Sequence, residues 1–251
     1  MRRVLVGTAF WALAVVALVA PASAQVVHSL NFGVGFFRPT PLDSRVAGDT
    51  IFADLHQPEV HPGITGSLLF DFRDFRAMPL FAEWLIALGD RVEVGVGTSF
   101  QNRSVNSIYR DVVDSHGTAT TVDDTDIAQT LRLRMIPLTG VVRFVFGSPT
   151  SAQGYIGGGV SAVMFRYSET GQFVDFTDDS VYDARYSRNG VGFGSVLVGG
   201  ARFALGGDVY ALTFEGRYQF ARANTGGLPN FLGEKIDLGG ATFNIGFLVR
   251  Y

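Results

Sequence analysis

The sequence contains no cysteine and only one lysine, Lys235, among its 251 residues. Without cysteine there is no disulfide framework, no thiolate metal site and no cysteine nucleophile. The formal net charge is −3, so the chain also lacks the basic surplus that marks a nucleic-acid-binding protein. We therefore predict no nucleic-acid partner, and we expect no cofactor.

Long apolar runs are equally scarce. The single one spans residues 4–20, follows Arg2 and Arg3, and leads to the small residues at 22–24. This order is typical of a secretory signal peptide, here residues 1–24, cut before Gln25. The alternatives are a retained membrane anchor and a twin-arginine export signal.

Removal of residues 1–24 leaves 251 − 24 = 227 residues, 25–251, with a formal charge of −3 − 2 = −5. That length suits a single β domain of the larger sort. No further apolar run reaches the roughly 18 residues of a membrane-spanning helix. The mature chain is therefore predicted not to be a helical membrane protein.

Glycine and phenylalanine are abundant, with 31 and 22 residues, and the chain alternates apolar and polar side chains. The pattern is clearest at residues 237–251, where one face carries Ala241, Phe243, Ile245, Phe247, Val249 and Tyr251. A period of two predicts a strand. Such an apolar face needs either lipid, as in the closing strand of a membrane barrel, or a second protein layer.

The same alternation predicts eight strands along the chain. They are expected at residues 28–39, 80–88, from 91, 127–146, 155–167, up to 205, from 208, and 237–251. Long loops are expected at 40–78, 111–126, 171–189 and 224–235, with a short helix at 50–57. Tight turns join the remaining strands. The long loops all lie on one side of the predicted sheet. This arrangement is typical of an eight-stranded antiparallel up-and-down barrel in a membrane.

Three finer features follow from the pattern. The alternation slips at Pro137, which predicts a β-bulge in the fourth strand. Gly206-Gly207 predicts a two-residue hairpin that pairs Phe203 with Tyr210. In the fifth strand, placing Arg166 inside the barrel would turn the face of Tyr155 and Tyr167 toward lipid.

The terminal alternation, with Ile245, Phe247, Val249 and Tyr251 at its end, resembles the signal by which the barrel-assembly machinery recognises outer-membrane barrels. With eight strands and one-sided loops, the chain resembles the small outer-membrane β-barrel family that includes the OmpA transmembrane domain and OmpW. That resemblance implies the outer membrane of a Gram-negative-type bacterium, with outer-membrane lipid, lipopolysaccharide and the assembly machinery as partners. A monomer is expected.

Strand phase also predicts a set of charged side chains inside the barrel. These are Glu83, Glu93, Arg132, Arg134, Arg143, Arg166, Arg202, Glu215, Arg217 and Arg250. Because an eight-stranded barrel leaves little interior space, such charges must pair with one another. The pattern favours a closed plug of ion pairs. A narrow conduction path, which opens when the pairs exchange partners, is the alternative.

Candidates for other chemistry are sparse and lie in loops. Asp114, Ser115 and His116 contain the residue types of a hydrolase, but they are adjacent in one loop. His56, Glu59 and His61 could hold a metal ion in another, although we predict no metal site and no catalytic site. The acidic loops could bridge to lipopolysaccharide phosphates through divalent cations. Trp84, Tyr109, Tyr155, Tyr167 and Tyr251 are candidates for aromatic girdles at the membrane interfaces.

Four functions are compatible with this reading. The first is a structural or surface-interaction barrel with a charge-plugged lumen and no enzymatic activity. The second is a narrow pore or uptake channel for small or apolar solutes. The third is a lipid-modifying outer-membrane enzyme. The fourth is a soluble exported barrel that binds a ligand and turns Phe243, Phe247 and Tyr251 inward.

Overall fold

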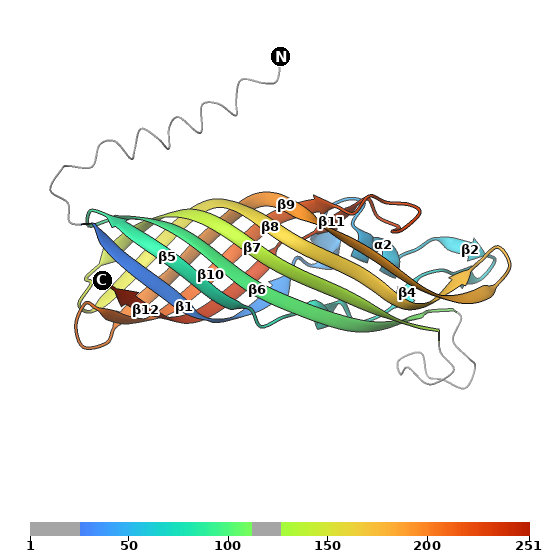
Figure 1. Cartoon of the computed structure of the whole chain (residues 1–251), viewed down its shortest axis with the longest axis horizontal. Helices are drawn as coiled ribbons and strands as arrows, with labels where there is room; N and C mark the ends of the chain where they lie inside the picture. The colour runs from blue at the N-terminus through green and yellow to red at the C-terminus, as the bar shows by residue number, and fades with distance from the viewer. Residues whose placement is uncertain (1–25, 112–126) are drawn as a thin grey trace, which may run out of the picture.

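The computed structural model describes residues 26–111 and 127–251. The predicted signal peptide, and most of the second predicted loop with its His116, lie outside these residues. Within them, eight long antiparallel strands each pair with the next, and the last pairs with the first. The strands are β1 (Val27–Pro39), β5 (Leu80–Leu88), β6 (Val92–Tyr109), β7 (Ala128–Gly147), β8 (Ala152–Asp175), β9 (Ser180–Ala204), β10 (Tyr210–Asn224) and β12 (Gly240–Arg250). The predicted eight-stranded up-and-down barrel is confirmed (Figure 1).

The remaining elements are short and belong to the connections. The first long connection contains η1 (Leu42–Ser44), α2 (Thr50–Leu55), β2 (Glu59–His61), β3 (Ile64–Thr65), β4 (Leu68–Leu69) and η2 (Phe72–Phe75), and the last contains β11 (Lys235–Asp237). The expected short helix is α2, whose first turn is capped because the Asp49 side chain accepts a hydrogen bond from the Phe52 N–H. None of the described helices has the length and apolar character needed to cross a bilayer.

The connections sort onto the two ends of the barrel. Residues 89–91, 148–151 and 205–209 form short turns at the end where β1 begins and the C-terminus lies, which we call the turn end (Figure 1). There the His28 N–H and the Tyr251 carbonyl hydrogen-bond at 3.2 Å. The long connections lie at the opposite end, the loop end. This one-sided arrangement agrees with the sequence prediction.

The outer face of the barrel is apolar near the turn end and becomes polar toward the loop end. On β7 this face presents Phe146, Phe144, Val142 and Leu138, all exposed, before it reaches Arg134 and Arg132. On four other strands the outward-facing apolar residues end at Arg38 of β1, Asn102 of β6, Arg166 of β8 and Arg222 of β10. We call the apolar zone the lipid belt, because a continuous apolar outer surface of this kind matches a membrane barrel.

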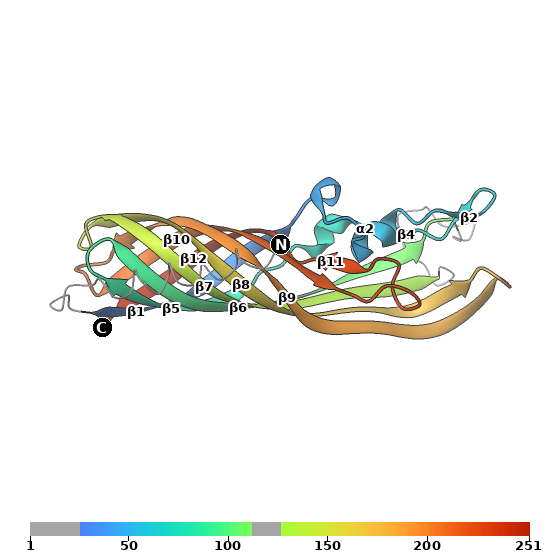
Figure 2. The same ribbon diagram turned by 90° about the horizontal axis from the view of Figure 1, so that it is seen from above.

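Beyond the lipid belt, β8 and β9 continue as one long hairpin. Their pairing runs without interruption from Ala152↔Phe203 to Asp175↔Ser180, and only residues 176–179 form the turn. The predicted loop at 171–189 is therefore wrong. A strand outside the lipid can be polar on both faces. The acidic residues that led us to predict a loop therefore lie in the hydrogen-bonded strand pair of β8 and β9. Figure 2 shows this hairpin curving past α2 and β4 at the loop end.

Two other local predictions are also wrong. β7 keeps one register with β6 on both sides of Pro137, from Thr98↔Leu138 to Gln101↔Met135, so there is no bulge. Proline removes one donor from the ladder, which interrupts the hydrogen bonds without requiring an extra residue.

The hairpin between β9 and β10 pairs Phe203 with Leu212, two positions away from the predicted Tyr210. Leu205 N–H donates to the Tyr210 carbonyl at 2.9 Å, so Gly206 and Gly207 open a four-residue turn rather than filling a two-residue one. Both glycines have positive φ, at 73° and 136°, which the turn requires and other residues rarely adopt.

Candidate functional site

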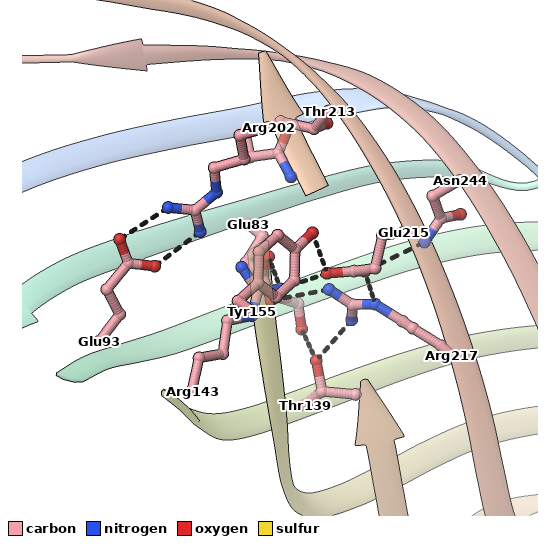
Figure 3. Close-up of polar contacts among 12 residues, drawn as sticks. Glu83, Glu93, Thr139, Arg143, Tyr155, Arg202, Thr213, Glu215, Arg217 and Asn244 are labelled. Atoms are coloured by element: carbon pink, nitrogen blue, oxygen red, sulfur yellow. Dashed lines mark hydrogen bonds and ion pairs between the residues drawn. The ribbon is translucent and has the colours of Figure 1, made fainter. Parts of the chain in front are cut away.

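The turn-end half of the barrel interior contains a cluster of paired charges. Arg143 of β7 lies at the centre, and its Nη2 donates at 2.5 Å to Oε2 of Glu83 and at 2.5 Å to Oε2 of Glu215 (Figure 3). Arg217 bonds to the other oxygens of the same two carboxylates, at 2.7 Å to Glu83 and through Nε to Glu215. Two arginines and two glutamates from β5, β7 and β10 thus form a closed ring across the lumen.

Tyr155 of β8 connects this ring to a second ion pair. Its hydroxyl donates to Glu215 Oε2 at 3.0 Å, and its ring centroid lies 4.6 Å from the Arg143 guanidinium and 4.7 Å from that of Arg202. Arg202 in turn forms two parallel bonds with Glu93, at 2.7 and 2.6 Å. We call Glu83, Glu93, Arg143, Tyr155, Arg202, Glu215 and Arg217 the lumen network.

The lumen network carries three positive and three negative side chains, so its formal charge cancels. Glu83, Arg143 and Arg202 are each at most 1% exposed, where an unpaired charge would be very costly. Next to the ion-pair ring lies a cavity of about 40 Å³, which is lined by Arg217, Thr139 and Asn244 among others. That space is of the order of one or two water molecules.

Six of the ten predicted inward charges belong to the lumen network, and the other four lie elsewhere. Arg250 is half-buried at the turn end and donates to the carbonyls of Asp208, at 2.7 Å, and Pro149, at 3.2 Å. Arg132, Arg134 and Arg166 are exposed on the outer surface, so their predicted inward placement is wrong. The continuous alternation through Pro137 points Leu131, Leu133 and Met135 inward and sends the arginines out, above the lipid belt.

The barrel interior near the loop end is packed with apolar side chains, which the sequence pattern did not predict. Leu131, Met135 and Val163 are at most 2% exposed there and pack with residues of the long connections, including Ile51 of α2 and Phe231. Tyr155 and Tyr167 are also buried inward, so their predicted lipid-facing placement is wrong. The unbroken period-two series from Leu131 to Val145 was the signal that could have revealed this layer.

The candidate girdle residues divide between the surface and the interior. Trp84 and Tyr251 are exposed at the turn end, where His28 stacks on both rings at centroid distances of 5.6 and 5.9 Å. Tyr109, like Tyr155 and Tyr167, is buried inside. Only Trp84 and Tyr251 therefore lie where a girdle at the membrane interface requires them.

Three of the predicted assembly-signal residues, Ile245, Phe247 and Val249, lie on the outer face of β12, and Tyr251 follows directly after the strand. Ile245 is 53% exposed and pairs with Val34 and Phe214, while Phe247 stacks on Tyr210 at 5.7 Å. Phe243 and Tyr251 are 67% and 71% exposed. The fourth functional reading, a soluble barrel with these aromatic residues inside, is therefore wrong, because the interior positions of β12 hold Asn244 and Leu248.

The loop histidines His56 and His61 contact different parts of the chain. His56 stacks on Phe52 at 4.3 Å, and His61 Nε2 contacts the Phe176 carbonyl at 2.8 Å. The Glu59 carboxylate accepts from Gly63 N–H, so the three candidate metal ligands do not converge. In residues 26–111 and 127–251 no group of three histidine or acidic side chains is arranged around a common metal position.

Comparison with solved structures finds this fold at low sequence identity. Outer membrane protein OprG of Pseudomonas aeruginosa is similar with a TM-score of 0.52 and 14% identity, over 91% of this chain and 97% of OprG. The attachment invasion locus protein Ail of Yersinia pestis gives 0.42 and 7%, over 90% and 99%. The N-terminal barrel of Pseudomonas aeruginosa OprF gives 0.36 and 11%, over 91% and 98%.

No protein-family model matches the sequence, and no curated protein matches it. The closed eight-stranded ring and the lipid belt nevertheless define the class. The chain has the fold of the small outer-membrane β-barrel proteins, the group that includes the OmpA transmembrane domain and OmpW, which reside in the outer membrane of Gram-negative bacteria. In such barrels the short turns are periplasmic and the long loops are extracellular. By that rule the turn end is expected to face the periplasm and the loop end, which we also call the extracellular end, to face outward.

Proposed function

We propose that this protein is a non-enzymatic outer-membrane barrel with a closed lumen, whose role is structural or depends on interactions at its extracellular end. The observation that carries the proposal is the closed ring of Glu83, Arg143, Glu215 and Arg217 across the lumen. Every carboxylate oxygen of Glu83 and Glu215 accepts a bond from Arg143 or Arg217, whereas Nε and Nη1 of Arg143 are buried without a partner in the described residues. Breaking such buried pairs without replacement is strongly unfavourable, which opposes spontaneous opening.

A second barrier lies above the ring. The interior toward the loop end is packed with apolar side chains of β7 and β8, and α2 and residue Phe231 cover them. An ion that passed the lumen network would then meet a dehydrated layer. These two consecutive barriers support a closed lumen rather than a narrow pore.

Planar-bilayer recording of the purified protein tests this function. The expected result is the absence of a steady conductance, with a large-pore porin in the same bilayer as positive control. A stable, ohmic conductance carried by the wild-type protein would overturn the closed-lumen proposal and favour the channel.

The lipid-modifying alternative is tested by the lipid A profile of cells that produce the protein or its His116→Ala variant. A lipid A species that requires His116 would favour that alternative.

We propose that lipopolysaccharide phosphates are partners of the outer surface, at Arg134 and Arg166. The two arginines are directly opposite in the β7–β8 register, on the outer face at the upper edge of the lipid belt. Ile136, Met164 and Val191 line a groove beside them. Like charges directly opposite one another destabilise a strand pair, whereas a phosphate between them would stabilise it.

Thermal unfolding in detergent micelles, with and without added lipid A, tests this partner. Lipid A is expected to raise the melting temperature of the wild-type protein, and the Arg134→Gln/Arg166→Gln variant should lose most of that increase. Arg185→Gln, an exposed arginine farther along β9, is the matched control. An equal increase for all three proteins would contradict the site. Inorganic phosphate in place of lipid A shows whether the acyl chains contribute.

The barrel-assembly machinery is a further proposed partner, recognised through Ile245, Phe247, Val249 and Tyr251. Deletion of Tyr251 is expected to reduce the amount of heat-modifiable, membrane-inserted protein. Normal insertion of the deletion variant would argue against this role.

A further inference from the structure

A solvent-open cavity lies at the extracellular end, separate from the lumen network. It has a volume of about 170 Å³ and lies between α2, the extended β8–β9 hairpin and residues 228–232. α2 is held against the residues that flank 228–232 by Thr50, whose hydroxyl contacts Thr225 Oγ1 at 3.1 Å and donates to the Gly233 carbonyl at 3.0 Å. Segments distant in sequence thus form one cavity, which Leu68 of β4 and Tyr109 of β6 also line.

Aromatic side chains form much of its wall. On the inner face of the hairpin, Phe173 packs against Tyr186 with ring centroids 5.0 Å apart, and Phe173 and Tyr182 are cross-strand partners. Tyr109 and Phe231 complete the aromatic lining. Ring faces of this kind attract organic cations, most strongly where water is excluded.

Two carboxyl groups lie among these rings, Asp54 of α2 and Glu169 of β8. Asp54 is 2% exposed, and its Oδ2 accepts from the Tyr167 hydroxyl at 3.1 Å. Glu169 is 6% exposed, is the cross-strand partner of Tyr186, and its Oε1 has no hydrogen-bond partner in the described residues.

Neither carboxyl forms an ion pair within residues 26–111 and 127–251. Arg45, which could approach from the same connection, is bonded to Asp49 through both Nε and Nη2, at 2.7 and 2.9 Å. The stretch 112–126 contains no lysine or arginine at all. In the described residues the titratable groups that face the pair are Tyr109, Tyr167, Tyr186 and Asp49, and none of them is a cation.

Burial raises the pKa of Glu169 to about 7, while burial and the nearby Glu169 carboxyl raise the pKa of Asp54 well above its ordinary value. Two buried acids need either protons or a counter-charge. A hard metal ion would require six or more oxygen ligands, and the carboxyl groups that line this cavity are only those of Asp54 and Glu169. A cation with an apolar body satisfies both the carboxyls and the rings.

We propose that this cavity binds a small organic ammonium ion, with Glu169 and Asp54 as the anionic partners and Phe173, Tyr182 and Tyr186 as the aromatic wall. This site goes beyond the proposed closed-barrel function, because it needs no passage through the lumen. The ammonium head lies against the unpartnered Oε1 of Glu169, and the apolar body contacts the hairpin rings.

Binding of choline to the full-length protein in detergent micelles tests the site, measured by isothermal titration calorimetry at about pH 8. The neutral isostere 3,3-dimethylbutan-1-ol has the same shape without the charge. Choline is expected to bind, with an affinity at least roughly tenfold higher than that of the alcohol. Glu169→Gln should reduce choline affinity to the level of the neutral isostere, and lowering the pH to about 5 should weaken binding to the wild-type protein.

Two further variants separate a binding role from a folding role. Tyr186→Leu removes an aromatic wall residue and leaves both carboxyls, so weaker choline binding with retained heat-modifiability is expected. Asp183→Asn removes an exposed acid from the same strand and should leave binding unchanged. The proposal is overturned if choline does not bind at millimolar concentration, if the alcohol binds equally well, or if Glu169→Gln binds choline like the wild type.

Discussion

Glu93 and Arg202 face each other across the lumen and form a double ion pair, with N–O distances of 2.7 and 2.6 Å. The two residues come from β6 and β9, which are separated by two strands on the barrel wall. The pair therefore joins opposite sides of the barrel wall in the turn-end half of the interior.

Glu93→Gln is expected to lower the free energy of unfolding by about 3 kcal/mol, because it leaves the buried Arg202 without its counter-charge. The double variant Glu93→Leu/Arg202→Met should lose clearly less, since no charge remains buried. Urea unfolding in phospholipid micelles, followed by heat-modifiable gel mobility, measures both. Equal losses for the single and double variants would show that pairing is not the source of the stability.

Tyr155 is expected to contribute in two separable ways. Tyr155→Phe removes the hydroxyl that donates to Glu215 and should cost about 1.5–3 kcal/mol, the range for hydrogen bonds to charged groups. Tyr155→Leu also removes the ring between the guanidiniums of Arg143 and Arg202 and should cost about 2 kcal/mol more. The same unfolding assay applies. If the two variants were equally stable, the contacts between the ring and the guanidiniums would be energetically unimportant.

The lipid belt predicts how β7 tolerates an outward charge at two depths. Val142→Arg, within the belt, is expected to destabilise the barrel by about 2–4 kcal/mol, whereas Thr130→Arg, beyond Arg132 and Arg134, should have almost no effect. The measurement is unfolding from lipid bilayers of defined thickness. A large effect at Thr130 would place the upper edge of the belt farther toward the loop end.

The raised pKa of Glu169 predicts a pH dependence at the extracellular end. Its pKa is about 7 in the folded state against an ordinary value of 4.5, so the folded state holds the proton more tightly. The stabilising contribution is complete below about pH 4.5 and is lost as the pH rises through 7, a change of roughly 3 kcal/mol. Asp54 acts in the same direction.

Amide hydrogen exchange, corrected for the intrinsic rate, should therefore show less protection of α2 at pH 8 than at pH 5. Glu169→Gln is the control, because an amide does not titrate and most of the difference should disappear. Greater protection of α2 at pH 8 than at pH 5 in the absence of ligand would contradict the predicted direction of this pH dependence.

The periodicity of the sequence was sufficient to predict the barrel. Residues 80–88 form β5 with the predicted bounds, and the apolar face of residues 237–251 lies on the outer surface. These predictions depend only on which side chains alternate, and lipid requires apolar residues on the outside.

Prediction failed where the chain leaves the lipid. The inward placement of Arg132, Arg134 and Arg166 assumed that charge belongs inside at every depth. Above the belt the solvent is outside, so the polarity of the two faces reverses while the strand continues. The Asp54–Glu169 pair was missed for a different reason: a helix in one connection and a strand 115 positions later meet only through tertiary packing.

The unbroken ladder of β8 and β9 has a consequence for the distance between the membrane and anything that binds at the hairpin tip. From Arg166, at the edge of the lipid belt, to Asp175 the strand rises by roughly 3.3 Å per residue, or about 30 Å in total along its length. The contact between His61 and the Phe176 carbonyl attaches the first connection to this tip. A macromolecule held there would be kept clear of the headgroups at a separation set by hydrogen-bonded backbone, which a flexible loop could not maintain.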